Sequence, residues 1–71
     1  MVVAQDNEKA YSWYLRAAEQ GYSGAQTNLG TLYYYGRGVE RNRGKAIEWY
    51  RAAADQGDLV ARDNLSKLGI K

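Results

Sequence analysis

The sequence contains no cysteine, no histidine, no proline and no phenylalanine in its 71 residues. Without cysteine and histidine the chain can form no disulfide and lacks the common zinc ligands, so we expect no structural metal and no cofactor. Without proline, nothing in the sequence forces a break inside a helix. A chain of this length has room for one small domain, and such domains bury only about 60% of their unfolded surface. Stability must therefore come from the close packing of a few elements.

Strong charge and long apolar runs are also missing. Lys and Arg number 10 and Asp and Glu number 8, and the resulting net charge of +2 is too small to create a strong field over the surface. No segment approaches the run of about 20 apolar residues that a transmembrane helix needs. No signal peptide is recognisable either. We therefore expect no membrane partner, and the cytoplasm is the default compartment.

Groups suited to catalysis are few. At neutral pH, proton transfer and nucleophilic attack depend largely on histidine, cysteine or an activated serine, and the serines of this chain have no candidate base beside them in sequence. The available carboxylate pairs are Glu19 with Asp58 and Asp55 with Asp58, which we interpret as solvated charges at helix ends. The sequence therefore predicts neither an enzyme nor a small-molecule substrate.

The sequence does contain an internal repeat. The segment Lys-Ala-Tyr-Ser-Trp-Tyr at 9–14 returns as Lys-Ala-Ile-Glu-Trp-Tyr at 45–50, and an alanine pair and then Gln-Gly follow each copy. Aligning residues 1–35 with 37–71, at an offset of 36 and without a gap, gives 13 identities in 35 positions. Such self-similarity at a fixed period indicates a repeat architecture.

Each repeat unit has the apolar pattern of two helices. The first stripe has spacings of three and four residues and recurs after 36 positions, as Ala10, Trp13, Tyr14, Ala17 and Ala18 and as Ala46, Trp49, Tyr50, Ala53 and Ala54. Both stripes predict amphipathic helices with their tryptophans and tyrosines in the core. Ala25, Leu29 and Leu32 predict the helix between them. The predicted helices span 7–20, 24–35, 43–56 and 59–68.

Residues suited to helix ends flank these segments. Asp6 and Asn42 are the expected N-caps of the first and third helices. Ser23, with Gln26 three residues later, predicts a capping box for the second helix. The glycines at 21 and 57 can adopt the left-handed conformation that ends a helix. Short turns after these glycines predict antiparallel hairpins, and Val39 is expected to pack the longer 36–41 connection against the core.

The glycine and aromatic pattern of the chain resembles the Sel-one-like repeat family, relatives of the tetratricopeptide repeats. The resemblance rests on Leu29-Gly30, Tyr33, Gly36, Gly38-Val39, Lys45-Ala46, Trp49-Tyr50, Ala53-Ala54 and Gly57. The period of 36 exceeds the tetratricopeptide period of 34. The resemblance implies an all-α fold, a short right-handed alpha-alpha superhelix of two helical-hairpin repeats. It also implies an adaptor or scaffold for protein complexes, as in many bacterial members.

Two departures from the repeat pattern affect the expected domain. Ser66 stands where the first unit has Gly30, and Gly69 stands where it has Tyr33. The first unit also lacks a leading helix. We therefore expect residues 1–71 to form a single Sel-one-like repeat domain that is a fragment of a repeat array or a minimal one.

The expected binding site is the concave face lined by helices 24–35 and 59–68. Thr27, Thr31 and Tyr34 share one face of their helix, and the 36-residue offset maps the two threonines onto Asp63 and Lys67. Adjacent repeats place such faces side by side. The sequence therefore predicts a shallow groove for an extended or helical segment of a protein partner.

Three alternatives remain open. Arg37, Arg41 and Arg43 lie in a loop close to tyrosines, a combination that can bind single-stranded nucleic acid, although a solvated turn explains it as well. Tyr11 and Leu15 are expected to be uncovered, which predicts a homodimer or a helix-exchanged oligomer. The chain can also be a designed or truncated repeat array with no function beyond folding.

Overall fold

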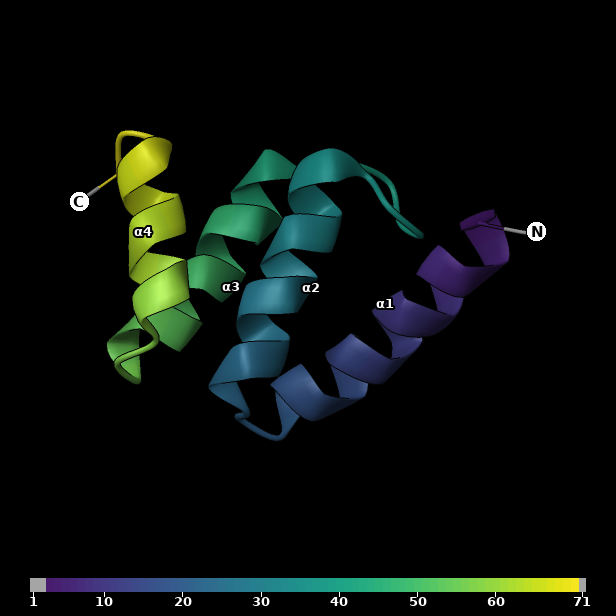
Figure 1. Cartoon of the computed structure of the whole chain (residues 1–71), viewed down its shortest axis with the longest axis horizontal. Helices are drawn as coiled ribbons and strands as arrows, with labels where there is room; N and C mark the ends of the chain where they lie inside the picture. The colour runs from purple at the N-terminus through teal and green to yellow at the C-terminus, as the bar shows by residue number, and fades with distance from the viewer. Residues whose placement is uncertain (1–2, 71) are drawn as a thin grey trace.

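The computed structural model describes residues 3–70, and within that range it contains four helices and no strand (Figure 1). The helices are α1 (Val3–Glu19), α2 (Ser23–Tyr35), α3 (Arg43–Asp55) and α4 (Leu59–Lys67). Each helix packs against the next along the chain, so that they lie side by side in the order α1 to α4. This arrangement confirms the predicted all-α superhelix of two helical hairpins. No helix in the described range is long and apolar enough to cross a membrane.

Side-chain caps and glycines set most helix ends. The Asn42 side chain accepts a hydrogen bond from the Lys45 amide at 3.0 Å and caps α3, as predicted. The Asp58 carboxylate caps α4 in the same way through the Ala61 amide, at 3.0 Å. Gly36 ends α2 with a φ of 71°, in the left-handed region that favours glycine. The connections between helices are therefore short and well defined.

Two predicted caps are wrong. α1 begins at Val3, so Asp6 lies in the first turn of the helix, where its charge complements the helix dipole. The residue before α2 is Tyr22, which makes no side-chain cap, and Ser23 is already helical. Gln26 does not complete a capping box, because its amide donates to the Ala18 carbonyl at 3.1 Å. Gln26 is buried, so its polar groups need partners inside the fold.

The core is made of small side chains with tyrosine rings between them. Leu29 is the largest side chain that is completely buried, and it belongs to one core cluster with alanines from α1, α3 and α4. Tyr33 and Tyr50 complete the packing between the helices. Val39 also packs against the core, which confirms the expected role of this residue in the 36–41 connection.

The prediction that both tryptophans are core residues is wrong for one of them. Trp49 on α3 is partly buried against the core, whereas Trp13, its equivalent on α1, is 70% exposed. The difference arises because α3 lies between α2 and α4, whereas α1 packs closely only against α2. Tyr14 is only partly buried for the same reason, whereas its equivalent Tyr50 is 3% exposed.

The close approach of α2 and α3 depends on one glycine. A Cβ atom at Gly30 would lie 2.8 Å from two carbons of the Tyr50 ring and 3.1 Å from the Ala46 carbonyl oxygen. A Cβ atom at Gly24, on the same helix, would meet nothing within 4 Å. Of the two glycines within α2, only Gly30 is therefore required for packing.

We expect Gly30→Ala to destabilise the fold by about 1–2 kcal/mol, because overpacking costs more than the helix propensity of alanine returns. Gly24→Ala should be stabilising by about 0.5 kcal/mol, because it gains propensity without a clash. Urea unfolding followed by circular dichroism measures both changes. Equal stability of the two variants would contradict the close contact between α2 and Tyr50.

Candidate functional site

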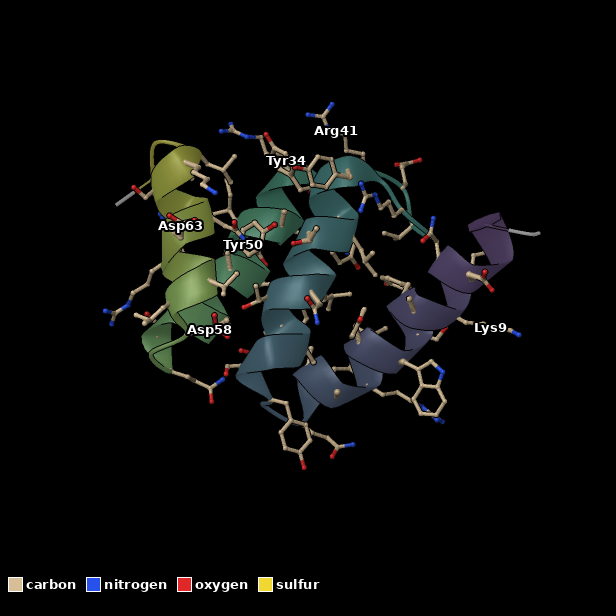
Figure 2. The ribbon with its side chains drawn as sticks, viewed as in Figure 1. Lys9, Tyr34, Arg41, Tyr50, Asp58 and Asp63 are labelled. Atoms are coloured by element: carbon tan, nitrogen blue, oxygen red, sulfur yellow. The ribbon has the colours of Figure 1, made fainter. Side chains whose placement is uncertain are left out.

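A shallow groove lies between α2 and α4, with α3 as its floor. Its volume is about 160 Å³, and the residues that line it are Tyr34, Tyr35, Tyr50, Asn64, Lys67 and Leu68. Figure 2 shows Tyr34 near the end of α2 and Tyr50 beneath it, facing α4. We call this surface the α2–α4 groove. It lies between the two helices that the sequence predicts to carry the binding site.

The floor of the groove is a tyrosine with a fixed hydroxyl. Tyr50 is buried, and its hydroxyl lies 2.8 Å from the Thr31 hydroxyl. Thr31 in turn donates to the Thr27 carbonyl oxygen at 3.2 Å. Burial raises the pKa of Tyr50, and the hydrogen bond with Thr31 opposes this only in part. The phenol therefore stays protonated at neutral pH and presents a neutral hydroxyl at the base of the groove.

One wall of the groove is a supported aromatic ring. Tyr34 is partly buried, and its ring packs edge-to-face on Tyr35, with centroids 5.0 Å apart and planes at 87°. The Arg41 side chain donates from Nε to the Tyr34 carbonyl oxygen at 3.1 Å, and its guanidinium lies 5.8 Å from the Tyr34 ring centroid. These contacts hold the ring in position before any partner arrives, which lowers the entropic cost of binding.

The opposite wall comes from α4. Lys67 forms an ion pair with Asp63 one turn earlier, at 3.0 Å between Nζ and Oδ2. Asp58 uses its carboxylate to cap the start of the same helix. Asn64 is partly buried and lines the groove, and its side chain makes no hydrogen bond within residues 3–70.

The five predicted binding residues occupy different positions relative to the α2–α4 groove. Tyr34 and Lys67 line the groove, Thr31 supports its floor, and Asp63 stands beside it as the partner of Lys67. The expectation that Thr27 projects to solvent is wrong, because it is only 5% exposed. α2 packs against α1 on one side and α3 on the other, so more than one stripe of it is buried.

Sequence reasoning missed three lining residues, Tyr35, Tyr50 and Leu68, of which Tyr50 was assigned to the core alone. A usable signal was the seven tyrosines in a chain without phenylalanine. A buried tyrosine needs a partner for its hydroxyl, so its polar end is usually found near a surface or another polar group. Tyrosine at a core position therefore indicates a ring whose hydroxyl end reaches an edge of the core.

The arginine loop packs onto the aromatic residues of α2. The Arg37 guanidinium lies 4.8 Å from the Tyr35 ring centroid, and Arg41 contacts Tyr34 as described. Arg43 is the exposed first residue of α3. Guanidinium groups already occupy one face of each tyrosine that a nucleobase would stack on. Nucleic-acid binding by Arg37, Arg41 and Arg43 stays an untested prediction.

The predicted self-association residues are not uncovered. The Tyr11 hydroxyl lies 2.8 Å from the Tyr33 hydroxyl, and the two rings pack edge-to-face at 5.7 Å. This hydrogen bond, followed by burial, raises the pKa of Tyr11. Leu15 is also partly buried against the core. The exposed aromatic residue of α1 is Trp13, so a self-association surface would be centred there, and self-association itself stays a prediction.

Two helical hairpins related by a 36-residue period, with a groove between α2 and α4, define a short α-solenoid of helical repeats. The model of the Sel1 repeat matches residues 1–22 and 23–58, and the chain therefore belongs to the Sel1 repeat family. Described residues contain no cluster of three or more metal-ligand side chains.

Solved and curated relatives agree with this assignment. The crystal structure of a Sel1 repeat protein from Oxalobacter formigenes is similar to this chain with a TM-score of 0.83 and 46% identity, over 86% of this chain and 25% of that one. An uncharacterized protein of Neisseria meningitidis is 50% identical over 36 residues, which are 51% of this chain and 8% of that protein. The ERAD-associated E3 ubiquitin-protein ligase component HRD3A of Arabidopsis thaliana is 50% identical over 36 residues, 5% of its length.

These relationships define the general class of function. Sel1 repeats form a family of helical scaffolds that generally mediate protein–protein interactions. The chain spans a quarter or less of each of these three relatives. The activities and partners of those whole proteins therefore do not transfer directly to it.

Proposed function

We propose that residues 1–71 form a single Sel1 repeat domain that binds a peptide segment of a partner protein in the α2–α4 groove. The observation that carries this proposal is the preorganised ring of Tyr34, held by Arg41 and Tyr35 above the buried Tyr50. Aromatic anchors supported in this way commonly dominate the energy of protein interfaces.

The size of the groove favours a peptide over a small molecule. Pockets for drug-sized ligands usually have volumes of about 300–1,000 Å³, and the groove has about 160 Å³. This space accommodates one or two side chains. A peptide that continues along α2 and α4 would add contacts outside it.

Selection from a displayed library of random 12-residue peptides tests the proposal without a known partner. The immobilised chain should enrich a set of related peptides, and synthetic fluorescent versions give dissociation constants by anisotropy. Failure to enrich any peptide that binds the free chain in solution would overturn the proposal.

We expect Tyr34→Ala to weaken the binding of these peptides by about 1–3 kcal/mol. The helical content should stay unchanged, because the ring is only partly buried. Tyr22→Ala is the matched control, since Tyr22 is 63% exposed and lies in the turn between α1 and α2. Equal losses for the two variants would place the binding surface elsewhere.

The nucleic-acid alternative predicts a different pattern. An oligothymidine would then bind with a steep salt dependence, and Arg43→Ala would weaken this binding while leaving the affinity for the peptides unchanged. Arg43 suits this comparison better than Arg41, because Arg41 also supports Tyr34.

A further inference from the structure

The charge of the α2–α4 groove is one-sided. Lys67 is the one ionised side chain among its six lining residues, and none of the six is a carboxylate. Asn64 adds an amide whose NH2 group can donate hydrogen bonds, while the Tyr50 hydroxyl, paired with Thr31, keeps a lone pair that can accept one. The groove therefore offers donors and a positive charge at the position where a ligand would lie.

The present partner of Lys67 is easily displaced. Its ion pair with Asp63 joins residues one turn apart on α4, and both side chains are largely exposed, at 72% for Lys67 and 61% for Asp63. Ion pairs of this kind contribute little, because water screens both charges and the side chains lose freedom. The Lys67 ammonium can therefore exchange Asp63 for a carboxylate bound in the groove.

Positive charge continues past the groove toward the 36–42 connection. Arg41 lies beside Tyr34, as Figure 2 shows, and Arg37 lies over Tyr35. Their guanidinium groups cover one face of each ring, which leaves less aromatic surface for stacking nucleobases. A chain of carboxylates can be attracted by these charges without needing open ring faces.

We propose that the α2–α4 groove recognises an acidic peptide segment, in which one carboxylate replaces Asp63 at Lys67 while a neighbouring apolar side chain contacts Tyr34. The inference rests on the proposed function and specifies its partner. Asp63, predicted from the sequence to contact the partner, acts here as an internal competitor.

A double-mutant cycle tests the proposal, using the peptides enriched on the chain. Each Asp or Glu of a peptide is replaced in turn by its amide, and one replacement should weaken binding by about three- to fivefold, as expected for an exposed ion pair. Lys67→Gln should weaken the binding of the parent peptide by the same factor, and it should leave the affinity for the amide-substituted peptide unchanged. Lys9→Gln is the charge-matched control, because Lys9 lies on α1, across the molecule from Tyr34 and Asp63 (Figure 2).

Removal of the competitor gives an opposite change. Asp63→Asn should strengthen acidic peptides by about two- to threefold, because Lys67 then has no ion pair to break. Asp55→Asn changes the net charge equally at the exposed end of α3 and should have little effect at physiological salt, where screening acts over about 8 Å.

The outcomes separate this inference from the proposed function. Peptides that depend on Tyr34 but bind equally well after amide replacement would overturn the acidic partner and leave the binding function intact. If Lys67→Gln and Lys9→Gln lowered the peptide affinity equally, the effect would come from net charge alone, and this would also overturn the inference. Tighter binding of oligothymidine than of any peptide, lost in Lys67→Gln, would assign the groove to nucleic acid.

Discussion

Leu29→Ala should lower the free energy of unfolding by about 2–5 kcal/mol, a loss comparable to the whole stability of a domain this small. Leu29 has no exposed surface, and it lies in the core cluster with residues from α1, α3 and α4. Because α2 packs against α1 of its own hairpin and α3 of the other, a cavity at Leu29 weakens contacts in both hairpins. Much of the variant is expected to be unfolded at 37 °C, which circular dichroism during heating measures.

Leu59→Ala is the matched control for this change, since the substitution is the same and the residue is 74% exposed. Leu59 is the first residue of α4, and its replacement should change stability by no more than about 0.5 kcal/mol. If the two variants melted at the same temperature, Leu29 would not be the centre of the core.

The helices and their order could be predicted from the sequence because one signal appears twice. The apolar stripes and the 36-residue offset locate α2, α3 and α4 within one or two residues of their observed bounds. The prediction failed at the start of α1, which begins at Val3 and includes Asp6 in its first turn. It also failed at Gln26. A capping motif describes only neighbouring residues, whereas the Gln26 side chain is buried and hydrogen-bonds to Ala18 and Gln56, which are distant in sequence.

The groove was predicted less well, because each helix was considered as having one buried face. That assumption holds for a helix with a neighbour on one side, but α2 has α1 and α3 on either side of it. Thr27 is therefore buried, although its helical position is close to that of Thr31 and Tyr34. Tyr50 also lines the groove, and this could not be predicted without knowing how α3 packs between α2 and α4.

Trp49→Ala should destabilise the fold by about 2–4 kcal/mol, whereas Trp13→Ala should change stability by no more than about 0.5 kcal/mol. The two residues occupy the same position in the two repeats, so sequence alone predicts equal effects. In the structure, Trp49 packs against the core on a helix with neighbours on both sides, whereas Trp13 is 70% exposed. The expected loss of stability at Trp49 is smaller than for a fully buried tryptophan, because Trp49 is only partly buried.

Urea unfolding by circular dichroism measures both changes, and fluorescence provides an independent check. Each single substitution leaves one tryptophan, so acrylamide should quench Trp13 in the Trp49→Ala variant more strongly than Trp49 in the Trp13→Ala variant. Similar quenching together with similar stability would mean that α1 buries its tryptophan as α3 does. That result would require Trp13 to be covered, for example by a second copy of the chain, and dilution should then expose it again.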